Sequence, residues 1–364
     1  MGTVRYVEAT RADTEHISKF LGISDHQILE REYFSYLADQ SVFFMAMDGE
    51  NIVGTQAFIP YEMNVNGRVL LTGRSERTLV SPSYRGQDVF VNLMDHCVRR
   101  ASEKGHMFFW GAATAATKAF KRVGYLQITR HREYLIAAVS GKQILSKVFS
   151  GERAGLLRPA HIIKTLRTRD RMQALYYAQL AVSPVSIIAR LPASALGALG
   201  RAKGLELVRV PKSEADIDDL YVRLRGQSKL MHLKHSAAFD KWMLHDARWF
   251  FAYCRGELIA YICLDLSDAV TAKLVDFAAA EKRAFYALLE ETRNVAQQEG
   301  RAFIYVVCNP NNFQQKALYP AFYAAGFVPS WRGGNSVVRA GTYNDMNMLA
   351  EKETWYMTDL WILM

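Results

Sequence analysis

The sequence predicts a protein of the α/β class, in which helices pack on mixed sheets (an α+β arrangement). Short apolar segments typical of strands alternate with segments of 3.6-residue apolar periodicity, and this order recurs in the second half of the chain. Half of the 364 residues are hydrophobic and no low-complexity tract interrupts them, which indicates a globular protein. The length allows two domains, each with its own core.

The first half reads as a strand, two helices and three strands joined by hairpins, followed by alternating helices and strands. Asp13 is positioned to cap the first helix, and Asp48-Gly49 and Asn66-Gly67 are hairpin signals. A long amphipathic helix stops at Gly105. The predicted strands are 4–10, 41–47, 52–63, 68–80, 106–112 and 127–138, and the predicted helices include 25–38, 89–105 and 114–124.

The second half repeats this order from Leu205 onward, which predicts an internal duplication. The predicted strands are 205–210, 249–254, 258–266, 272–280 and 302–308, with two more at the C-terminal end, the last being TWYMTDLWI. The predicted helices are 213–224, 236–246, 281–300 and 311–327. We therefore expect domains at 1–140 and 205–364, joined by a helical connector at 141–204.

The connector carries all of the excess charge. Eleven Lys and Arg face only Glu152 and Asp170 between residues 141 and 204, which accounts for the net charge of +9. A solvated connector explains this charge, and so does attraction to an anionic membrane surface, an acidic carrier protein or nucleic acid.

The cysteines and the apolar runs indicate the compartment. Four scattered cysteines without CxxC spacing predict a reducing environment and no metal site. The N-terminus lacks an apolar signal segment, and no run reaches the roughly 20 apolar residues of a membrane span. We expect a cytoplasmic protein, with the connector as the one candidate for peripheral membrane contact.

The stretch VSPSYRGQDVF (80–90) joins a strand to a helix through a glycine turn. Such a turn offers free backbone N–H groups to a phosphate. Asp88 lies where an anion would bind, and a carboxylate a few Å from a diphosphate repels it by about 1–4 kcal/mol. Either this loop is a modified donor site, or Asp88 caps its own helix and the loop is a structural relic.

With the following segment HMFFWGAATAATKAFKRVGY, this stretch resembles the GNAT superfamily of N-acyltransferases over residues 1–140. The second half resembles it only through its strand–helix order and ALYPAFYAAGF, with no glycine loop between VDFAAA and EKRAFYALL. Two such halves and the ending TWYMTDLWILM are similar to acyltransferases encoded with bacterial polysaccharide genes. Those relatives often carry Gly-Phe-Pro-Asn where this sequence has Gly111-Ala112-Ala113-Thr114.

The resemblance implies acetyl-CoA or another acyl-CoA as co-substrate and no metal. In the family, the loop amides hold the coenzyme A diphosphate and the preceding strand pairs with the pantetheine arm. The donor-binding residues implied here are Leu79, Val80, Arg85, Gly86, Gln87, Asp88 and Val89. The implied acceptor is a small amine, with an amino sugar as the expected class, bound between the two halves.

Transfer to an amine needs a base for the amine and an acid for the leaving thiolate. Glu76 is our candidate base because it shares a strand with Val80, although a salt bridge with Arg74 or Arg77 explains it equally. His106 is a second candidate base. The family places its acidic Tyr four residues before the glycine of the last helix, where this sequence has Phe120 and, in the second half, Phe322.

Other aromatic and polar residues are candidates for the remaining roles. Tyr84 and Tyr125 are the candidate acids, with Tyr323 as a further nearby tyrosine. Trp110 either lines the cleft or packs in the core. Asp276, Asn309 and Asn312 are expected at strand ends that face the equivalent cleft of the second half.

Two alternatives to a coenzyme A-dependent enzyme stay open. Tandem folds of this kind include enzymes that take aminoacyl-tRNA, and others use acyl carrier proteins, and the basic connector suits either acidic donor. A non-catalytic scaffold would explain Asp88, the missing tyrosines and the absent second loop.

Overall fold

The computed structural model describes residues 3–113, 116–139, 204–226, 229–244, 246–343, 345–351 and 353–356. The chain forms two compact units: unit 1 comprises 1–129, 229–243 and 334–354, and unit 2 comprises 130–228, 244–333 and 355–364. The connector expected at 141–204 lies outside the described residues except for Gly204. Each unit takes residues from both halves of the chain, whereas the domains expected from the sequence take one half each. Those expected boundaries stay a prediction.

Unit 1 is built on a mixed sheet whose strand order is β1-β2-β3-β4-β5-β13, with β8 paired to β3. Strands β4 and β5 are parallel, and the other pairs are antiparallel. Its strands are β1 (Arg5–Glu8), β2 (Val42–Asp48), β3 (Asn51–Val65), β4 (Arg68–Val80), β5 (Phe108–Ala113), β8 (Met231–Leu233) and the end of β13 (Val328–Ala340).

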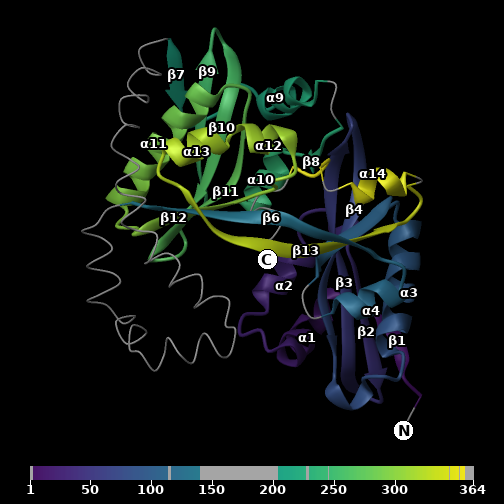
Figure 1. The fold of residues 1–364 in the computed structure, drawn as a ribbon. Helices are drawn as coiled ribbons and strands as arrows, with labels where there is room; N and C mark the ends of the chain where they lie inside the picture. The colour runs from purple at the N-terminus through teal and green to yellow at the C-terminus, as the bar shows by residue number, and fades with distance from the viewer. Residues whose placement is uncertain are drawn as a thin grey trace. The chain divides into compact units, whose positions relative to one another are not determined.

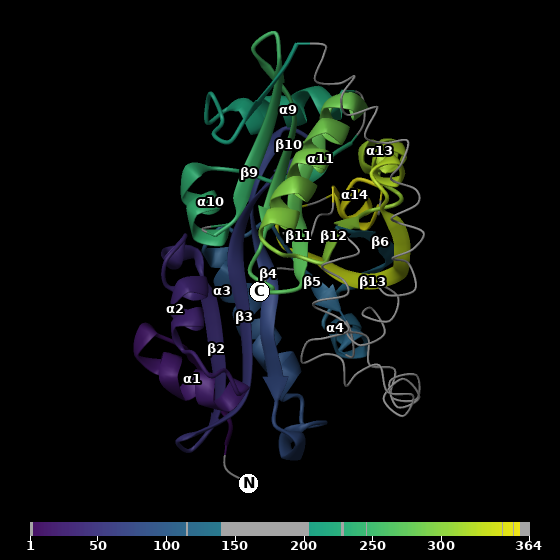
Figure 2. The same cartoon turned by 90° about the vertical axis from the view of Figure 1, so that its left-hand side faces the viewer.

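Helices cover both faces of this sheet. In Figures 1 and 2, α1 and α2 lie on one face and α3 lies on the other. Apolar side chains of α3, including Leu93, Met94 and Cys97, pack on Phe44 and Phe58 of the sheet to form the core. The helices are α1 (Thr14–Leu21), α2 (Gln27–Tyr33), α3 (Val89–Glu103), α4 (Thr117–Arg122), α10 (Ala237–Met243) and α14 (Met346–Ala350).

The hairpins form where the sequence predicts them. Gly49 and Glu50 join β2 to β3 directly after Asp48, and Asn66 and Gly67 turn β3 into β4 with φ of 53° and 86°. Both residues of the second turn have positive φ, which Asn and Gly adopt at low cost and which suits the twist of paired strands.

Unit 2 has a second mixed sheet, in the order β6-β12-β11-β10-β9-β7. Its one parallel pair is β11 with β12. Helices α9 and α11 pack on opposite faces of β10 (Figures 1 and 2). The elements are β6 (Leu126–Ala138), β7 (Leu205–Val208), α9 (Asp216–Arg225), β9 (Arg248–Cys254), β10 (Glu257–Asp265), β11 (Thr271–Ala279), α11 (Lys282–Gln298), β12 (Phe303–Cys308), α12 (Phe313–Ala317) and α13 (Tyr319–Ala324).

The two halves of the sequence exchange their closing strands. Residues 133–138 of β6, from the first half of the sequence, pair with β12 of unit 2. Residues 335–340 of β13, from the second half, pair with β5 of unit 1. Both exchanged pairings are antiparallel. The mixed-sheet α/β class predicted from the sequence is confirmed in each unit.

One expectation for the second half is wrong in detail. The helix expected at 311–327 is two helices, because Pro320 lacks an N–H and lies in the first turn of α13 instead of continuing α12. Most of the strand expected at TWYMTDLWI lies outside the described residues, and its described part, Thr354–Tyr356, contains an isolated bridge at Trp355. Strand β8 and helix α14 were not expected, although Asp345 caps α14 by accepting the N–H of Met348 at 3.0 Å.

Among the described helices, none combines the length and the apolar character needed to cross a membrane.

Candidate active site

A bulge in β4 separates this strand from its neighbour β5. Thr55 pairs with Leu79 and Ala57 pairs with Glu76, so Gln56 alone faces both Arg77 and Thr78. Arg77 adopts a left-handed backbone with φ of 53°, which costs about 1–2 kcal/mol for a residue that is not glycine. Beyond the pairs that end at Arg74–Trp110, β4 and β5 no longer pair.

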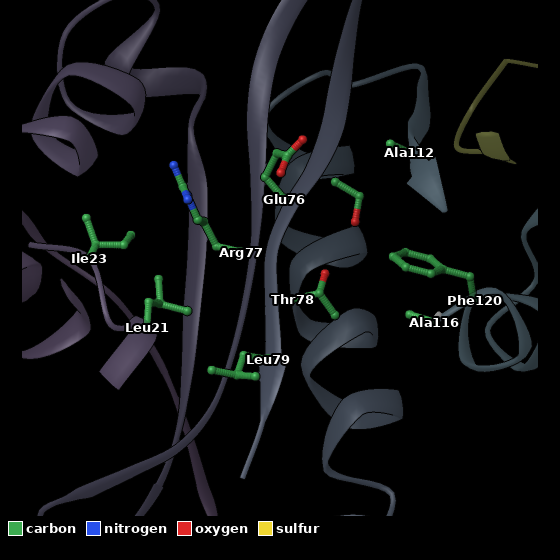
Figure 3. Close-up of a pocket in the computed structure, with 10 residues that line it drawn as sticks. Leu21, Ile23, Glu76, Arg77, Thr78, Leu79, Ala112, Ala116 and Phe120 are labelled. Atoms are coloured by element: carbon green, nitrogen blue, oxygen red, sulfur yellow. The ribbon is translucent and has the colours of Figure 1, made fainter. Parts of the chain in front are cut away.

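A cavity of about 370 Å³ opens where the strands part (Figure 3). One wall comes from β4 itself, a second from the end of α1, and a third from β5 and α4. The lining residues are Leu21, Ile23, Ser75, Glu76, Arg77, Thr78, Leu79, Ala112, Ala116 and Phe120. In Figure 3, Arg77 points toward Leu21 and Ile23, and Thr78 points toward Phe120.

A polar network holds the bulge in place. The hydroxyl of Thr78 donates to Oε1 of Gln56 at 2.6 Å, and Nε2 of Gln56 donates to Oγ of Ser75 at 2.9 Å. Gln56 is fully buried, so these hydrogen bonds fix two residues of the cavity wall from behind.

The backbone of Val80 presents an N–H group away from β3. Ser81 donates its N–H to the carbonyl of Val53 at 2.9 Å, and Val80 lies opposite Gly54. Successive residues of an antiparallel pair point their polar groups to opposite sides, so the N–H of Val80 faces the side from which β5 has departed. Such a donor can stabilise the oxygen of a reacting carbonyl.

The loop from Ser81 to Asp88 ends in a set of backbone N–H groups at the start of α3. Gly86 has φ of 82°, and a Cβ built on it would have no atom within 4 Å, so its backbone is openly accessible. Within the described part of the chain, the N–H groups of residues 86–91 have no hydrogen-bond partner. They fit an anion such as a diphosphate.

Asp88 does not occupy these N–H groups. It has a left-handed backbone with φ of 58°, and its side chain makes no capping hydrogen bond to α3. Its Oδ1 instead accepts from Nη2 of Arg122 on α4 at 2.9 Å, and both side chains are exposed. The capping alternative therefore does not describe this carboxylate, and the loop is open.

Glu76 lines the cavity and also forms the salt bridge that the sequence allowed. Its Oε1 lies 2.7 Å from Nη2 of Arg74, which is 1% exposed and stacks on the ring of Trp110 at 5.7 Å. Arg77 pairs with Glu32 instead. The buried guanidinium of Arg74 holds the Glu76 carboxylate at the cavity wall.

Neither candidate tyrosine lines the cavity. Tyr84 donates its hydroxyl to Asp48 at 2.5 Å, and this hydrogen bond is the first cause of its raised pKa. Tyr125 is buried with its hydroxyl on Sδ of Met94, and burial raises its pKa well above the usual value. Phe120 is the ring that lines the cavity at the position where the family has its acid.

Trp110 and His106 belong to the core of unit 1. The indole N–H of Trp110 donates to Oγ1 of Thr72 at 3.0 Å. His106 is fully buried with Nε2 at 2.8 Å from the carbonyl of Gln40, and burial lowers its pKa to about 4. Neither residue lines the cavity.

Asp276 and Asn309 lie in unit 2, where both are buried. Asp276 accepts from the hydroxyl of Tyr261 at 2.6 Å, and Asn309 donates to the carbonyl of Trp355 at 2.8 Å. Asn312 caps α12 by accepting the N–H of Gln315 at 3.1 Å. The structure thus gives these residues local structural partners, and their assignment to an acceptor site stays a prediction.

The corresponding region of unit 2 contains packed aromatic side chains. Strand β11 leaves β12 after Leu274, two residues before Asp276, as β4 leaves β5 two residues before Glu76. Phe277 packs against Phe322 and Tyr356 there. Ala280 and Glu281 alone join β11 to α11, so no phosphate loop is present, as the sequence indicates.

The sequence analysis missed several cavity residues. Leu21 and Ile23 line the cavity because of the way α1 packs, and no sequence pattern indicated this packing. Arg77 and Thr78 had a signal, because RSERT (74–78) is a polar run inside a long strand, and such a run indicates a break in the sheet. Arg122, the partner of Asp88, lies 34 residues further along the chain, and no sequence pattern indicated this pair.

Comparison with known proteins relates this site to a family. Residues 11–128 match the family model of the acetyltransferase (GNAT) domain. This part of the chain is similar to a GNAT acetyltransferase domain. It contains β4, the loop, α3 and the whole cavity. A search of curated protein sequences found no match.

Solved structures resemble the chain over more than the GNAT domain. A probable N-acyltransferase from Enterococcus faecalis V583 has a TM-score of 0.59 at 11% identity, over 93% of this chain and 73% of its own. A GCN5-related N-acetyltransferase from Kribbella flavida has a TM-score of 0.59 at 14% identity, over 93% and 71%. A tandem GNAT protein from the clavulanic acid pathway has a TM-score of 0.52 at 12% identity, over 94% and 100%.

At these identities the similarity establishes the fold, including its tandem form. Together with the GNAT domain, it supports the prediction of a transferase of class EC 2.3.1. Among the described residues, no group of three or more His, Cys, Asp or Glu is arranged to hold a metal ion.

Proposed function

We propose that unit 1 transfers an acyl group from acyl-CoA to a primary amine. The observation that carries this proposal is the pairing of Asp88 with Arg122, because it leaves the N–H groups of residues 86–91 available to a diphosphate. The cavity of about 370 Å³ supports the proposal, since it falls in the size range of small-molecule sites. A scaffold with a filled cleft would lack such a space.

Each step of the transfer has a group from this chain. The loop amides of residues 86–91 would hold the diphosphate, and the open edge of β4 at Leu79 and Val80 would pair with the pantetheine arm. The donor supplies a thioester carbonyl, whose oxygen would accept from the N–H of Val80. Glu76 would take a proton from the amine as the new C–N bond forms.

The C–S bond then breaks and the sulfur leaves as a thiolate. The described cavity wall has a phenyl ring, Phe120, and no phenol at this point. We propose that the thiolate takes its proton from water, which thiols allow because their pKa is near 8.5. Tyr84 and Tyr125 stay candidates whose hydroxyls would have to act from outside this wall.

The acceptor proposed from the resemblance is an amino sugar of polysaccharide biosynthesis. Acyl carrier protein and aminoacyl-tRNA remain alternative donors. Cytoplasmic location, a bacterial source and contact between residues 141–204 and a membrane or carrier protein also stay proposals, and none of them rests on the described residues.

Thiol release with acetyl-CoA and a panel of amines tests the proposal. We expect amine-dependent release by the wild type and a loss of about 100-fold or more in Glu76→Gln, the scale typical of removing a general base. Release without any dependence on amine, or full activity in Glu76→Gln, would overturn the assignment of Glu76. No release with any amine would favour the carrier-protein, tRNA or scaffold alternatives.

A further inference from the structure

The cavity has two sides, and they differ in chemistry. The side formed by β5 and α4 presents Ala112, Ala116 and Phe120, which are uncharged. The other side lies toward α1, where Arg77 points in Figure 3. Because the open edge of β4 faces the departed β5, the proposed donor takes the uncharged side, and the acceptor must approach past Glu76 and Arg77.

An acceptor on that side meets one anion and one cation. The side chain of Glu76 is 20% exposed, and so is the side chain of Arg77. These two residues are adjacent in β4 at the bulge. The apolar side chains of Leu21 and Ile23 complete the wall.

Arg77 is held so that part of its guanidinium stays unused. Its Nε and Nη2 donate to Oε2 of Glu32 at 3.1 and 2.6 Å. Glu32 is 1% exposed and does not line the cavity, so a ligand there meets the arginine and not this carboxylate. No partner for Nη1 of Arg77 occurs in the described part of the chain.

We propose that the acceptor is an anionic primary amine, whose amino group binds at Glu76 and whose carboxylate or phosphate binds at Arg77. This proposal rests on the proposed function of the same cavity. An amino acid and an amino sugar that carries an acidic group share this chemistry. The opposite charges of the ligand complement the adjacent opposite charges of the protein.

A neutral amine fits this wall less well. It would remove water from Nη1 of Arg77 without supplying a charged acceptor, and an unpaired buried donor is costly. The left-handed backbone of Arg77 also points to a role at this position, because strained residues that are not glycine concentrate at functional sites.

Two variants test the charge of Arg77 without leaving the buried carboxylate of Glu32 unpaired. Glu32→Gln removes the carboxylate that neutralises Arg77 and keeps its shape. Glu32→Gln with Arg77→Asn removes both charges, and Asn tolerates the left-handed backbone. Thermal unfolding of all three proteins checks that each is folded.

The probes are two matched pairs: L-leucine with L-leucinamide, and glucosamine 6-phosphate with glucosamine. For each pair, calorimetry in the presence of free coenzyme A gives the ratio of affinities, and thiol release gives the ratio of kcat/KM. Because each ratio is compared between variants, the intrinsic basicity of the amines cancels. The amino-acid pair and the sugar pair distinguish the two sources of an anionic amine.

We expect the wild type to prefer the anionic member of at least one pair. Glu32→Gln should raise this preference, and the double variant should lower it by about 10- to 100-fold relative to Glu32→Gln, the scale of a charged hydrogen bond. An equal ratio in all three folded proteins, for both pairs of probes, would overturn the proposal. Failure of the wild type to bind coenzyme A would instead overturn the proposed function and this inference with it.

Discussion

The carboxylate of Asp88 faces Arg122 on α4 and not the N–H groups at the start of α3. Oδ1 of Asp88 and Nη2 of Arg122 lie 2.9 Å apart, and the left-handed backbone of Asp88 directs its side chain to this partner. From the sequence alone, Asp88 is expected to repel an anion at this loop. In the structure, its charge is neutralised by Arg122 of α4. We expect this pair to decide whether the loop between β4 and α3 accepts a diphosphate.

A double-mutant cycle measures this relationship. We expect Arg122→Ala to weaken acetyl-CoA binding about tenfold or more, because the freed carboxylate then repels the diphosphate at short range. In an Asp88→Gly background the same change should weaken binding less than about threefold. Calorimetric titration of the four proteins gives both values.

Lys121→Ala is the matched control for the cycle, since it removes a neighbouring exposed charge on α4 that has no carboxylate partner among the described residues. It should have the same small effect in both backgrounds. Equal losses for Arg122→Ala with and without Asp88 would contradict the account.

Phe120 stands where the family has a phenolic acid, and it lines the cavity. Phe120→Tyr should raise kcat for thiol release by up to about tenfold, because a hydroxyl at this wall can protonate the leaving sulfur. Phe90→Tyr adds the same hydroxyl to the ring that packs on Phe120 without lining the cavity, and should leave kcat unchanged. If both variants behave alike, proton donation at residue 120 is excluded.

Arg74 holds Glu76 and acts only through it. Arg74→Met should therefore lower kcat, because the carboxylate of Glu76 loses its fixed position. KM should change by a smaller factor than kcat. Added to Glu76→Gln, it should cause almost no further loss. Additive losses in the double variant would show that Arg74 acts independently of Glu76, and unfolding midpoints separate this from destabilisation.

His106 predicts a pH dependence of stability. Burial lowers its pKa in the folded protein to about 4, against about 6.5 in an unfolded chain. Below pH 6.5 the unfolded state therefore binds a proton that the folded state does not, and stability falls until the pH reaches about 4. The shift of roughly 2.5 pH units corresponds to about 3 kcal/mol.

Urea unfolding of the wild type between pH 7 and pH 4 measures this loss. His106→Gln should remove about that part of the pH dependence, while His16→Gln, at an exposed position, should not. A slope that His106→Gln leaves unchanged would assign the acid sensitivity to other groups.

Local patterns were sufficient for most elements of both units. Asn66-Gly67 specified its hairpin, the periodicity of 89–105 specified α3, and Gly86 marked the loop, because each depends on residues close in sequence. The sequence could not show that β6 and β13 change partners between units, since either edge can accept an antiparallel strand with the same apolar pattern.

The site was predictable to the same extent. Glu76, Leu79 and the loop were found because they belong to one strand–loop–helix. Arg122, Glu32 and Ile23 were missed because their contacts with that segment depend on how separate elements pack. Pro320 indicated that the helix expected at 311–327 would be divided, but the helical periodicity of this segment was given more weight.

Calorimetric titration of the wild-type protein with acetyl-CoA is the decisive experiment, because it asks whether the open loop between β4 and α3 binds the donor. We expect micromolar binding that weakens in Arg122→Ala. If neither the wild type nor Asp88→Gly binds acetyl-CoA while both proteins are folded, the loop is not a donor site and the scaffold alternative is favoured.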